Sequence, residues 1–400
     1  MTTVVVSAFN VARKPEIGGH FWVYFQYAHG LRRLGCDVFW LEQLPDDGPD
    51  HDASVATFFR RMERFGLGGR AILHETTAEG ELRFVGTSPA AAEGLFRRAD
   101  LLLNFHYAIE PGLLSRFRRT ALVDIDPGLL QYWISRGQLQ VPPHDLYLTI
   151  GETVGTPGSL VPDCGLDWIH IRPPVCLDLW PYTYDPACRR FTTVSSWLGK
   201  QYVTAGGKKE RRILYDNTKR VAFLPFVELA AKAASELELA LYLHERLDTG
   251  DRELLERNGW HVRHALEVAN TPDSYRSYIQ ASRGEFSCAK PSCIEFQNAW
   301  VSDRSLCYLA SGKPVVVQDT GPSSFLPDGE GIFRFSTVEE AAEALATIEA
   351  AYEPHCRAAR AIAEELFDAR VVLSTMLNAV ETAPADAPAP SRVEQVRAAP

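Results

Sequence analysis

This 400-residue chain lacks several features, and each absence excludes a class of protein. No window stays apolar over the length of a membrane span, so we expect no transmembrane segment. The opening residues TTVVVSAFN carry no basic leader of the kind found in signal peptides, which predicts a cytoplasmic location. The eight cysteines include no CxxC pair, and we expect buried, reduced thiols. No residues show metal-ligand spacing, so neither a metal nor another cofactor is expected.

An excess of positive charge is also missing. The chain has 41 Lys and Arg residues against 51 Asp and Glu residues, for a formal net charge of −10. A protein that binds nucleic acid without sequence preference needs a basic surface, so no nucleic-acid partner is expected. A small anionic ligand stays compatible with this charge, because a few backbone amides and one arginine can hold it.

The composition itself is that of a globular protein, with 46% hydrophobic and 23% charged residues, and its length exceeds one ordinary core. Two domains are therefore expected. In each half, short apolar runs alternate with amphipathic stretches, the pattern of a doubly wound α/β fold with a mostly parallel sheet. The expected strands are residues 4–6, 36–41, 101–105, 121–125, 145–150 and 168–171, then 191–196, 239–243, 262–266, 285–288, 314–318 and 332–335. The expected helices are residues 20–34, 54–65, 217–235, 251–257, 272–281, 302–311 and 338–349, with a hairpin over 76–85.

A segment rich in proline and glycine, residues 151–190, separates the two halves. It places the hinge near Pro173 and Pro174, between an N-terminal domain (1–173) and a C-terminal domain (174–355). Both domains would present the carboxyl ends of their strands to one central cleft, where ligands bind. Helical periodicity predicts a terminal helix over residues 356–382 that packs back across the hinge, followed by a disordered tail over 383–400.

The most informative segment is SDRSLCYLASGKPVVVQDTG, residues 302–321. Ser302 can cap a helix, and Gly312 suits the left-handed position that follows one. Pro314 cannot continue the helix, and the valines after it predict a buried parallel strand. Because the start of such a helix leaves backbone amides unpaired, it is a favourable seat for a phosphate group.

This segment resembles the group 1 glycosyltransferases of the GT-B fold. Their signature is a strand, a polar loop and a helix ending in Ala-x-Gly-x-Pro-Val-Val, followed by an acidic residue and glycine. It is present here as Glu285-Phe-Ser-Cys and then Ala310-Ser-Gly-Lys-Pro-Val-Val-Val-Gln-Asp-Thr-Gly. The E-x7-E pattern of the family is incomplete: Glu295 is present, but the helix opens with Ser302-Asp303-Arg304-Ser305, as in divergent members. A looser similarity links Gly18-Gly19-His20 to the N-terminal Gly-Gly loop of the family.

The resemblance implies two Rossmann-like domains that transfer a sugar from a nucleoside-diphosphate sugar to a small-molecule or glycan acceptor, without a metal. It leaves the sugar, the base, the acceptor, the stereochemistry and the oligomeric state open. Charge that develops on the diphosphate would be met by groups fixed in advance around the key helix. Alternatively, Asp303 merely caps that helix and Arg304 is solvated. The expected donor-binding residues are Gly18, Gly19, Lys200, Lys219, Leu266, Ser302, Arg304, Ser305, Asp319, Thr320 and Gly321.

The candidate catalytic residues are Asp126, His106 and His20. A general base for an acceptor hydroxyl needs a carboxylate or an imidazole, and Asp126 and His106 each follow an expected strand. Each also has a plain structural interpretation, since Asp126 precedes the turn-forming Pro-Gly pair and His20 begins a helix. A retaining enzyme would need no single base.

Two other functions stay open on this fold. Arg13-Lys-Pro-Glu16 faintly resembles a motif of sugar-nucleotide epimerases, and a catalytically silent binding module is the third alternative. The Gly18-Gly19-His20 loop directly behind that motif favours a transferase. Polar residues at the ends of the expected strands argue against a silent module.

Overall fold

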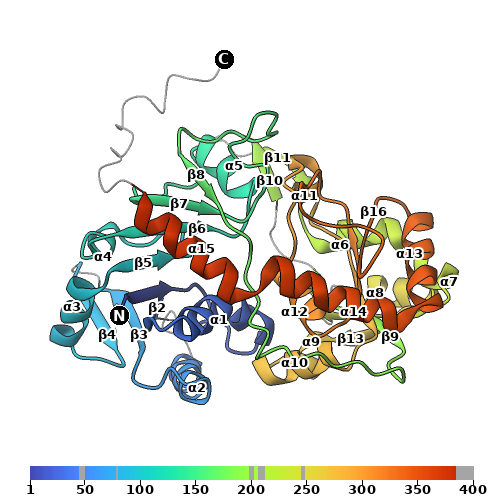
Figure 1. Cartoon of the computed structure of the whole chain (residues 1–400), viewed down its shortest axis with the longest axis horizontal. Coiled ribbons are helices and arrows are strands. Elements are labelled where there is room, and N and C mark those ends of the chain that lie inside the picture. The colour runs from blue at the N-terminus through green and yellow to red at the C-terminus, as the bar shows by residue number, and fades with distance from the viewer. Residues whose placement is uncertain (45–49, 78–79, 198–201, 206–211, 245–247, 384–400) are drawn as a thin grey trace. The chain divides into compact units, whose positions relative to one another are not determined.

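The computed structural model describes residues 1–44, 50–77, 80–197, 202–205, 212–244 and 248–383, and Figure 1 shows its elements. The chain divides into two compact units. Unit 1 contains residues 1–155, 162–171 and those from 369 onward, and unit 2 contains residues 156–161 and 172–368. The chain therefore completes unit 2 and then returns to unit 1.

Unit 1 is built on an eight-stranded sheet with the order β4-β3-β2-β1-β5-β6-β7-β8. Neighbouring strands are parallel, except that β3 and β4 form an antiparallel hairpin. The central strands β1 and β6 are buried along their whole length, as expected for a parallel sheet covered on both faces. The strands are β1 (Thr3–Ser7), β2 (Asp37–Gln43), β3 (Ala71–Thr76), β4 (Leu82–Val85), β5 (Leu101–Asn104), β6 (Thr120–Asp124), β7 (Leu146–Thr149) and β8 (Trp168–His170).

Helices cover both faces of this sheet. On one face, Phe21 of α1 stacks on Trp40 of β2 with ring centroids 5.9 Å apart. On the other face, Phe96 of α3 packs in a core cluster with Val5 and Leu41. The last helix, α15, packs beside α1, as Figure 1 shows. The helices are α1 (Gly18–Arg33), α2 (His51–Arg64), α3 (Pro89–Arg98), α4 (Pro111–Leu114), α5 (Leu129–Ser135) and α15 (Ala369–Thr382).

Unit 2 is built on a six-stranded sheet with the order β13-β12-β9-β14-β15-β16, all parallel. Its core is aromatic: the ring of Phe286 stacks on that of Phe335 at 5.2 Å. The strands are β9 (Arg190–Ser196), β12 (Glu236–Tyr242), β13 (His261–His264), β14 (Gly284–Ser287), β15 (Val315–Gln318) and β16 (Ile332–Phe335), with a separate antiparallel pair, β10 (Tyr202–Ala205) and β11 (Arg212–Asp216). The helices are α6 (Lys219–Phe223), α7 (Leu229–Lys232), α8 (Thr249–Arg257), α9 (Ala265–Val268), α10 (Pro272–Gln280), α11 (Pro291–Phe296), α12 (Asp303–Ala310), α13 (Val338–Ala350) and α14 (Tyr352–Ile362).

The predicted alternation of strands and helices in two halves is confirmed, and three local predictions were wrong. The expected helix over 217–235 is broken into α6, a 3-10 turn and α7, because Pro225 removes a backbone donor and restricts the residue before it. The periodic stretch 354–381 is interrupted by a π-helical turn, Ala363–Phe367, and by non-helical Asp368. The hairpin turns at Gly80, where φ is +85°, but its first strand begins at Ala71 rather than at residue 76. The helix α3 and the pair β10–β11 were not predicted.

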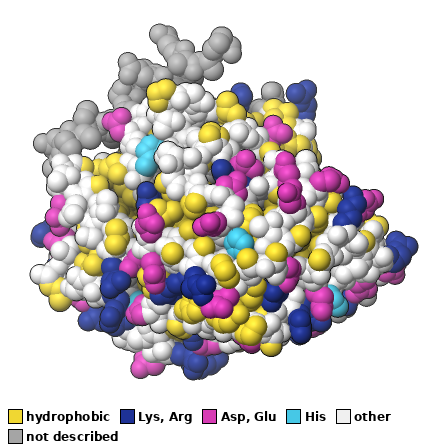
Figure 2. Space-filling model, turned by 45° about the vertical axis from the view of Figure 1, so that its right-hand side comes forward, with side chains coloured by type: hydrophobic (Ala, Val, Ile, Leu, Met, Phe, Trp, Pro, Cys, Tyr) yellow, Lys and Arg dark blue, Asp and Glu magenta, His cyan; other side chains and the backbone are white. Residues whose placement is uncertain are grey.

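The surface carries both signs of charge. On the face drawn in Figure 2, basic and acidic side chains are interspersed with apolar ones. All eight cysteines are free thiols, of which Cys176, Cys188, Cys288, Cys307 and Cys356 are buried. Among the described helices, none combines the length and apolar character that crossing a membrane requires.

Candidate functional site

Unit 2 contains a small cavity, of about 20 Å³, at the carboxyl ends of β14 and β15. Ligands of parallel α/β sheets bind at this edge. Four predicted donor-binding residues, Ser302, Ser305, Thr320 and Gly321, meet in its wall. The remaining lining residues are Ser287, Cys288, Ala289, Trp300, Val301, Val317, Gln318, Leu326, Ile332 and Arg334.

The start of α12 forms one wall of this cavity. Ser302 is the N-cap, and its Oγ accepts a hydrogen bond from the amide of Arg304 at 3.3 Å, as the sequence predicted. Gly312 follows the helix with a φ of +70°, also as predicted. Ser305 lies in the first turn and is buried, and its Oγ has no hydrogen-bond partner among the described residues. An unpaired hydroxyl in the wall of a cavity is available to a ligand or to an ordered water, because leaving it unpaired costs free energy.

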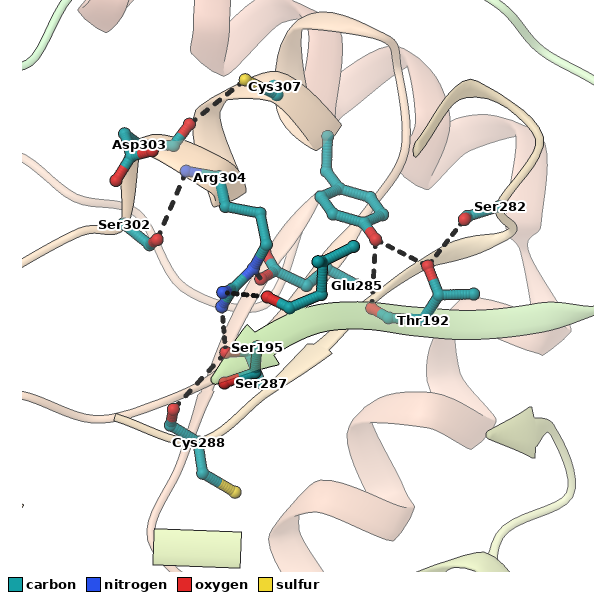
Figure 3. A network of polar contacts seen from close by, with 12 residues as sticks. Thr192, Ser195, Ser282, Glu285, Ser287, Cys288, Ser302, Asp303, Arg304 and Cys307 are labelled. Carbon is teal, nitrogen blue, oxygen red and sulfur yellow. Dashed lines mark hydrogen bonds and ion pairs between the residues drawn. The ribbon is translucent and has the colours of Figure 1, made fainter. Parts of the chain in front are cut away.

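Arg304 points away from solvent into a network of side chains, drawn in Figure 3. Its Nε donates to Oε1 of Glu285 at 2.7 Å, and its Nη1 donates to the carbonyl of Val194 at 2.9 Å. Its Nη2 donates to the hydroxyl of Ser287. The alternative that this guanidinium is solvated is therefore wrong. Its three internal partners give Arg304 a structural role beneath the cavity, and direct contact with a diphosphate stays a prediction.

Lys219 lies at the start of α6 and is buried beside the cavity. Its Nζ donates to the carbonyl of Cys288, and the ammonium lies 5.8 Å from the ring centre of Trp300. Burial, together with the positive charges of Arg304 and Lys290, lowers the pKa of Lys219 to about 7. An anion in the cavity would reverse this effect and favour the charged ammonium.

Lys290 is a residue that the sequence analysis missed. It caps α11 and lies close enough to Lys219 to lower the pKa of that residue. Its position was readable from the sequence, since it follows the expected strand 285–288 by two residues and precedes Pro291. Three basic residues thus lie close together: Lys219, Lys290 and Arg304. Of these, Arg304 forms an ion pair with Glu285.

A pair of loops forms the rim of the cavity. The amide of Ala299 donates to the carbonyl of Thr320 at 3.0 Å, and the Thr320 hydroxyl donates to the carbonyl of Trp300 at 2.8 Å. Gln297 and Ala299 have positive φ angles of 50° and 54°, a strained conformation for residues with a Cβ. Gly321 is needed here because a Cβ would lie 2.8 Å from the backbone of Gln297.

The other predicted donor-binding residues of unit 2 lie outside this wall. Asp319 accepts a hydrogen bond from the amide of Gly321 at 3.0 Å and lies 3.5 Å from Nη1 of Arg334, so it shapes the rim. The Leu266 amide already donates to Nδ1 of His264 at 3.1 Å. Lys200 falls outside the described residues. No group of three or more His, Cys, Asp or Glu side chains suited to a metal ion occurs in the described part of the chain.

The carboxyl edge of the sheet in unit 1 brings the predicted catalytic residues around Phe9. Gly18 and Gly19 begin α1, and His20 follows in its first turn. The carbonyl of Phe9 lies 2.7 Å from Nε2 of His20. A carbonyl can only accept, so Nε2 carries the proton and Nδ1 is left with its lone pair. Burial lowers the pKa of His20, which keeps the imidazole neutral.

His106 contacts the ring of the same phenylalanine. Its imidazole stacks on the ring of Phe9 at 4.6 Å, and Asn104 holds its backbone through two hydrogen bonds of 3.0 and 3.1 Å. Burial lowers the pKa of His106 to about 4. Asp126 interacts electrostatically with His20 and raises the pKa of that residue against the effect of burial. The three predicted residues are thus neighbours.

Asp126 is held by a tyrosine that the sequence analysis did not select. The hydroxyl of Tyr107 accepts hydrogen bonds from the amides of Ile125 and Asp126, at 2.9 and 3.1 Å. The same hydroxyl lies 3.4 Å from Oδ2 of Asp126. These hydrogen bonds fix the turn that follows β6. Asp126 therefore takes part in this turn, as its structural interpretation predicted, and this role does not prevent its carboxylate from acting as a base.

Glu42 anchors the loop between β1 and α1 and was also missed. Its Oε1 accepts from the amide of Ala12 at 2.8 Å, and its Oε2 accepts from the indole of Trp40 at 3.0 Å. Burial raises the pKa of this carboxyl to about 7. The sequence did contain a signal for this role, since Glu42 lies inside the apolar strand DVFWLEQ. A carboxylate buried there needs a specific partner, which predicts a structural or functional role for Glu42.

No protein-family model matches this chain, and no curated protein matches its sequence. Solved structures nevertheless share its fold. Sucrose-phosphate synthase from Thermosynechococcus elongatus aligns over 95% of this chain and 98% of its own, with 12% identity and a TM-score of 0.54. HepE from Anabaena, in complex with UDP and glucose, covers 96% of this chain and 100% of its own at 11% identity, with a TM-score of 0.54. An alpha-glucosyltransferase in complex with UDP covers 95% and 100%, at 11% identity and a TM-score of 0.59. The predicted GT-B fold is thereby confirmed.

Proposed function

We propose that this protein is a glycosyltransferase that moves a sugar from a nucleoside-diphosphate sugar to a small hydroxyl-bearing acceptor. The observation that carries the proposal is the unpaired hydroxyl of Ser305, buried in the cavity at the start of α12. The free amides of a helix N-terminus attract an anion, and a cluster of cations adds to that attraction. Structural neighbours of the same fold contain UDP, which supports a nucleoside diphosphate as the anion.

In the proposed reaction, the diphosphate is the leaving group and lies between the start of α12 and Lys219. Charge grows on it as the glycosidic bond breaks, and donors fixed in advance stabilise that charge. Protonated Lys219 would supply a positive charge next to Cys288. Arg304 would act from beneath, by holding Glu285 and Ser287 in place.

The acceptor hydroxyl would lose its proton to a group in unit 1. His20 offers Nδ1 as a neutral base, since its other nitrogen is engaged with Phe9. His106 and Asp126 are the alternatives, and a retaining reaction would need none of the three as an obligatory base. One structural neighbour was solved with UDP and DNA, but the net charge of −10 and the mixed charges on the face drawn in Figure 2 favour a small acceptor over a nucleic acid.

We further propose that the enzyme works without a metal or cofactor, in the cytoplasm. Lysine and helix amides can neutralise a diphosphate without a cation. Eight free thiols are typical of a reducing compartment.

The test is to incubate the protein with a panel of nucleotide sugars and to follow diphosphate release with and without acceptors, each with and without EDTA. Acceptor-dependent release that survives EDTA is expected. Interconversion of the sugar without release would identify an epimerase. Absence of binding to any nucleotide sugar by calorimetry would refute the proposal.

A further inference from the structure

A row of polar side chains follows the apolar core on one face of the unit 1 sheet. Successive residues of a strand alternate between faces, so residues two apart share one face. Val5, Leu102 and Ile72 belong to the core cluster beneath α3. The residues two positions later are Ser7 on β1, Asn104 on β5 and His74 on β3. All three are buried, at the carboxyl edge where the predicted catalytic residues lie.

Of these three residues, Asn104 has hydrogen-bond partners. Asn104 donates from Nδ2 to Nε2 of His144 at 3.0 Å, and the Nδ1 of His144 lies 2.7 Å from the carbonyl of Pro142. Both nitrogens of this buried histidine are therefore satisfied. Further along the sheet, the buried carboxylate of Asp124 is also paired: its Oδ2 accepts a hydrogen bond from Nε2 of Gln131 at 2.8 Å.

The other two residues, Ser7 and His74, have polar side-chain atoms without a hydrogen-bond partner among the described residues. His74 is only 4% exposed, and neither ring nitrogen has a hydrogen-bond partner among the described residues. Ser7 is 1% exposed, and its Oγ is likewise unpaired. Buried polar groups in folded proteins almost always have partners, so three such atoms on one face indicate a ligand or ordered water. Gln43, which is paired with His74 in the sheet, is exposed and marks where this part of the face reaches solvent.

The chemistry of these atoms selects the ligand. A serine hydroxyl and a neutral imidazole each offer both a donor and an acceptor, and neither carries charge. Burial lowers the pKa values of His74 and His106 to about 4, which supports neutral rings. Ser7 and His74 themselves offer no opposite charge to a carboxylate or an ammonium group, whereas the hydroxyls of a sugar or polyol can both donate to them and accept from them.

We propose that Ser7 and His74 form a subsite for neutral hydroxyl groups of the acceptor, next to the stacked pair of Phe9 and His106. The statement that the ligand is the acceptor rests on the proposed function. The observation that these atoms are unpaired does not depend on the proposed function. In the ligand-free protein these unpaired atoms lower the free energy of unfolding, and hydrogen bonds to the bound hydroxyls restore it.

The experiment compares His74→Leu and Ser7→Ala with His144→Leu, a buried histidine whose nitrogens are both paired. In the ligand-free protein, we expect His74→Leu and Ser7→Ala to unfold at or above the wild-type temperature, and His144→Leu to unfold below it. With a working acceptor, His74→Leu should raise the acceptor KM at least about fivefold, which corresponds to one lost hydrogen bond. The affinity for UDP should not change.

The second measurement does not depend on transferase activity. Protein labelled with ¹⁵N-histidine is titrated with methyl α-glucoside, and the imidazole signals are assigned by the histidine variants. Saturable shifts of the His74 and His106 signals, without a shift of the His144 signal, would support the subsite even if no donor were turned over. Unchanged His74 signals, or a loss of stability in His74→Leu equal to that in His144→Leu, would overturn it.

Discussion

Arg304 and Glu285 form an ion pair of 2.7 Å in which Glu285 is fully buried and the side chain of Arg304 is only 11% exposed. Glu285 lies on β14 and Arg304 in the first turn of α12, so the pair ties the helix to the sheet. Removing one partner of such a pair leaves an uncompensated charge in the interior. The guanidinium therefore supports the floor of the candidate donor site.

Replacing Arg304 should destabilise the protein rather than only inactivate it. Arg304→Ala is expected to lower the free energy of unfolding by about 3–5 kcal/mol, because Glu285 would lose its counter-ion. Urea denaturation followed by circular dichroism measures this. Arg252→Ala, which removes an exposed ion pair with Glu256, is the control and should change stability by less than about 0.5 kcal/mol. An Arg304→Ala protein of normal stability that no longer binds UDP would place the guanidinium on the diphosphate instead.

Two serines of the same helix turn should respond in opposite ways. Ser302→Ala removes the N-cap and should cost about 0.5–2 kcal/mol of stability. Ser305→Ala removes an unpaired buried hydroxyl, so the ligand-free protein should keep or gain stability while the affinity for UDP falls. Thermal unfolding with and without UDP separates the two effects. Loss of stability in Ser305→Ala without UDP would mean that its hydroxyl has a structural partner.

The segment 302–321 shows what the sequence alone could predict. The cap at Ser302, the left-handed Gly312 and the strand after Pro314 depend on neighbours within a few residues, so local chemistry determines them. The alternation of strands and helices, and with it the fold, follows from hydrophobic periodicity in the same way.

The partners of the site residues could not be predicted in this way. Val194 lies 110 residues before Arg304 in the chain, and only the order of strands in the sheet brings them together. The unpaired state of Ser7 and His74 likewise depends on what three different strands place around them. The positive φ of Ala299 has no local signal, since alanine does not favour that conformation.

Donor binding should depend on pH through Lys219. Since burial lowers the pKa of this ammonium to about 7, an anion that prefers the charged form should bind with proton uptake. The UDP affinity is expected to fall by up to about tenfold for each pH unit above 7, and Lys219→Met should lose this dependence. Calorimetry in buffers of different ionisation enthalpy measures the protons taken up. Lys232→Met, which changes an exposed lysine, is the control, and proton uptake that persists in Lys219→Met would assign the effect to another group.

Lys219 should also make stability depend on pH. Its pKa is lower in the folded protein than in the unfolded chain, so the unfolded chain binds the extra proton. Stability should therefore rise as the pH increases from about 7 toward the ordinary lysine value near 10.4. Lys219→Met should flatten this rise, and urea midpoints across that range would show it. An unchanged slope in the variant would mean that Lys219 is charged when folded.

The pH–rate profile should identify the base in unit 1. If His20 accepts the proton of the acceptor, His20→Gln should lower kcat by about 10²–10⁴-fold with little change in the affinity for UDP. Burial lowers the pKa of His20 below its ordinary value, so the wild-type rate should fall only when acid protonates Nδ1. His106 would instead give an acid limb near pH 4, because burial lowers its pKa to about that value. Circular dichroism at each pH separates loss of rate from unfolding. A kcat unchanged in both His20→Gln and His106→Asn would leave Asp126 as the base, or indicate a retaining reaction in which no single side chain takes the proton.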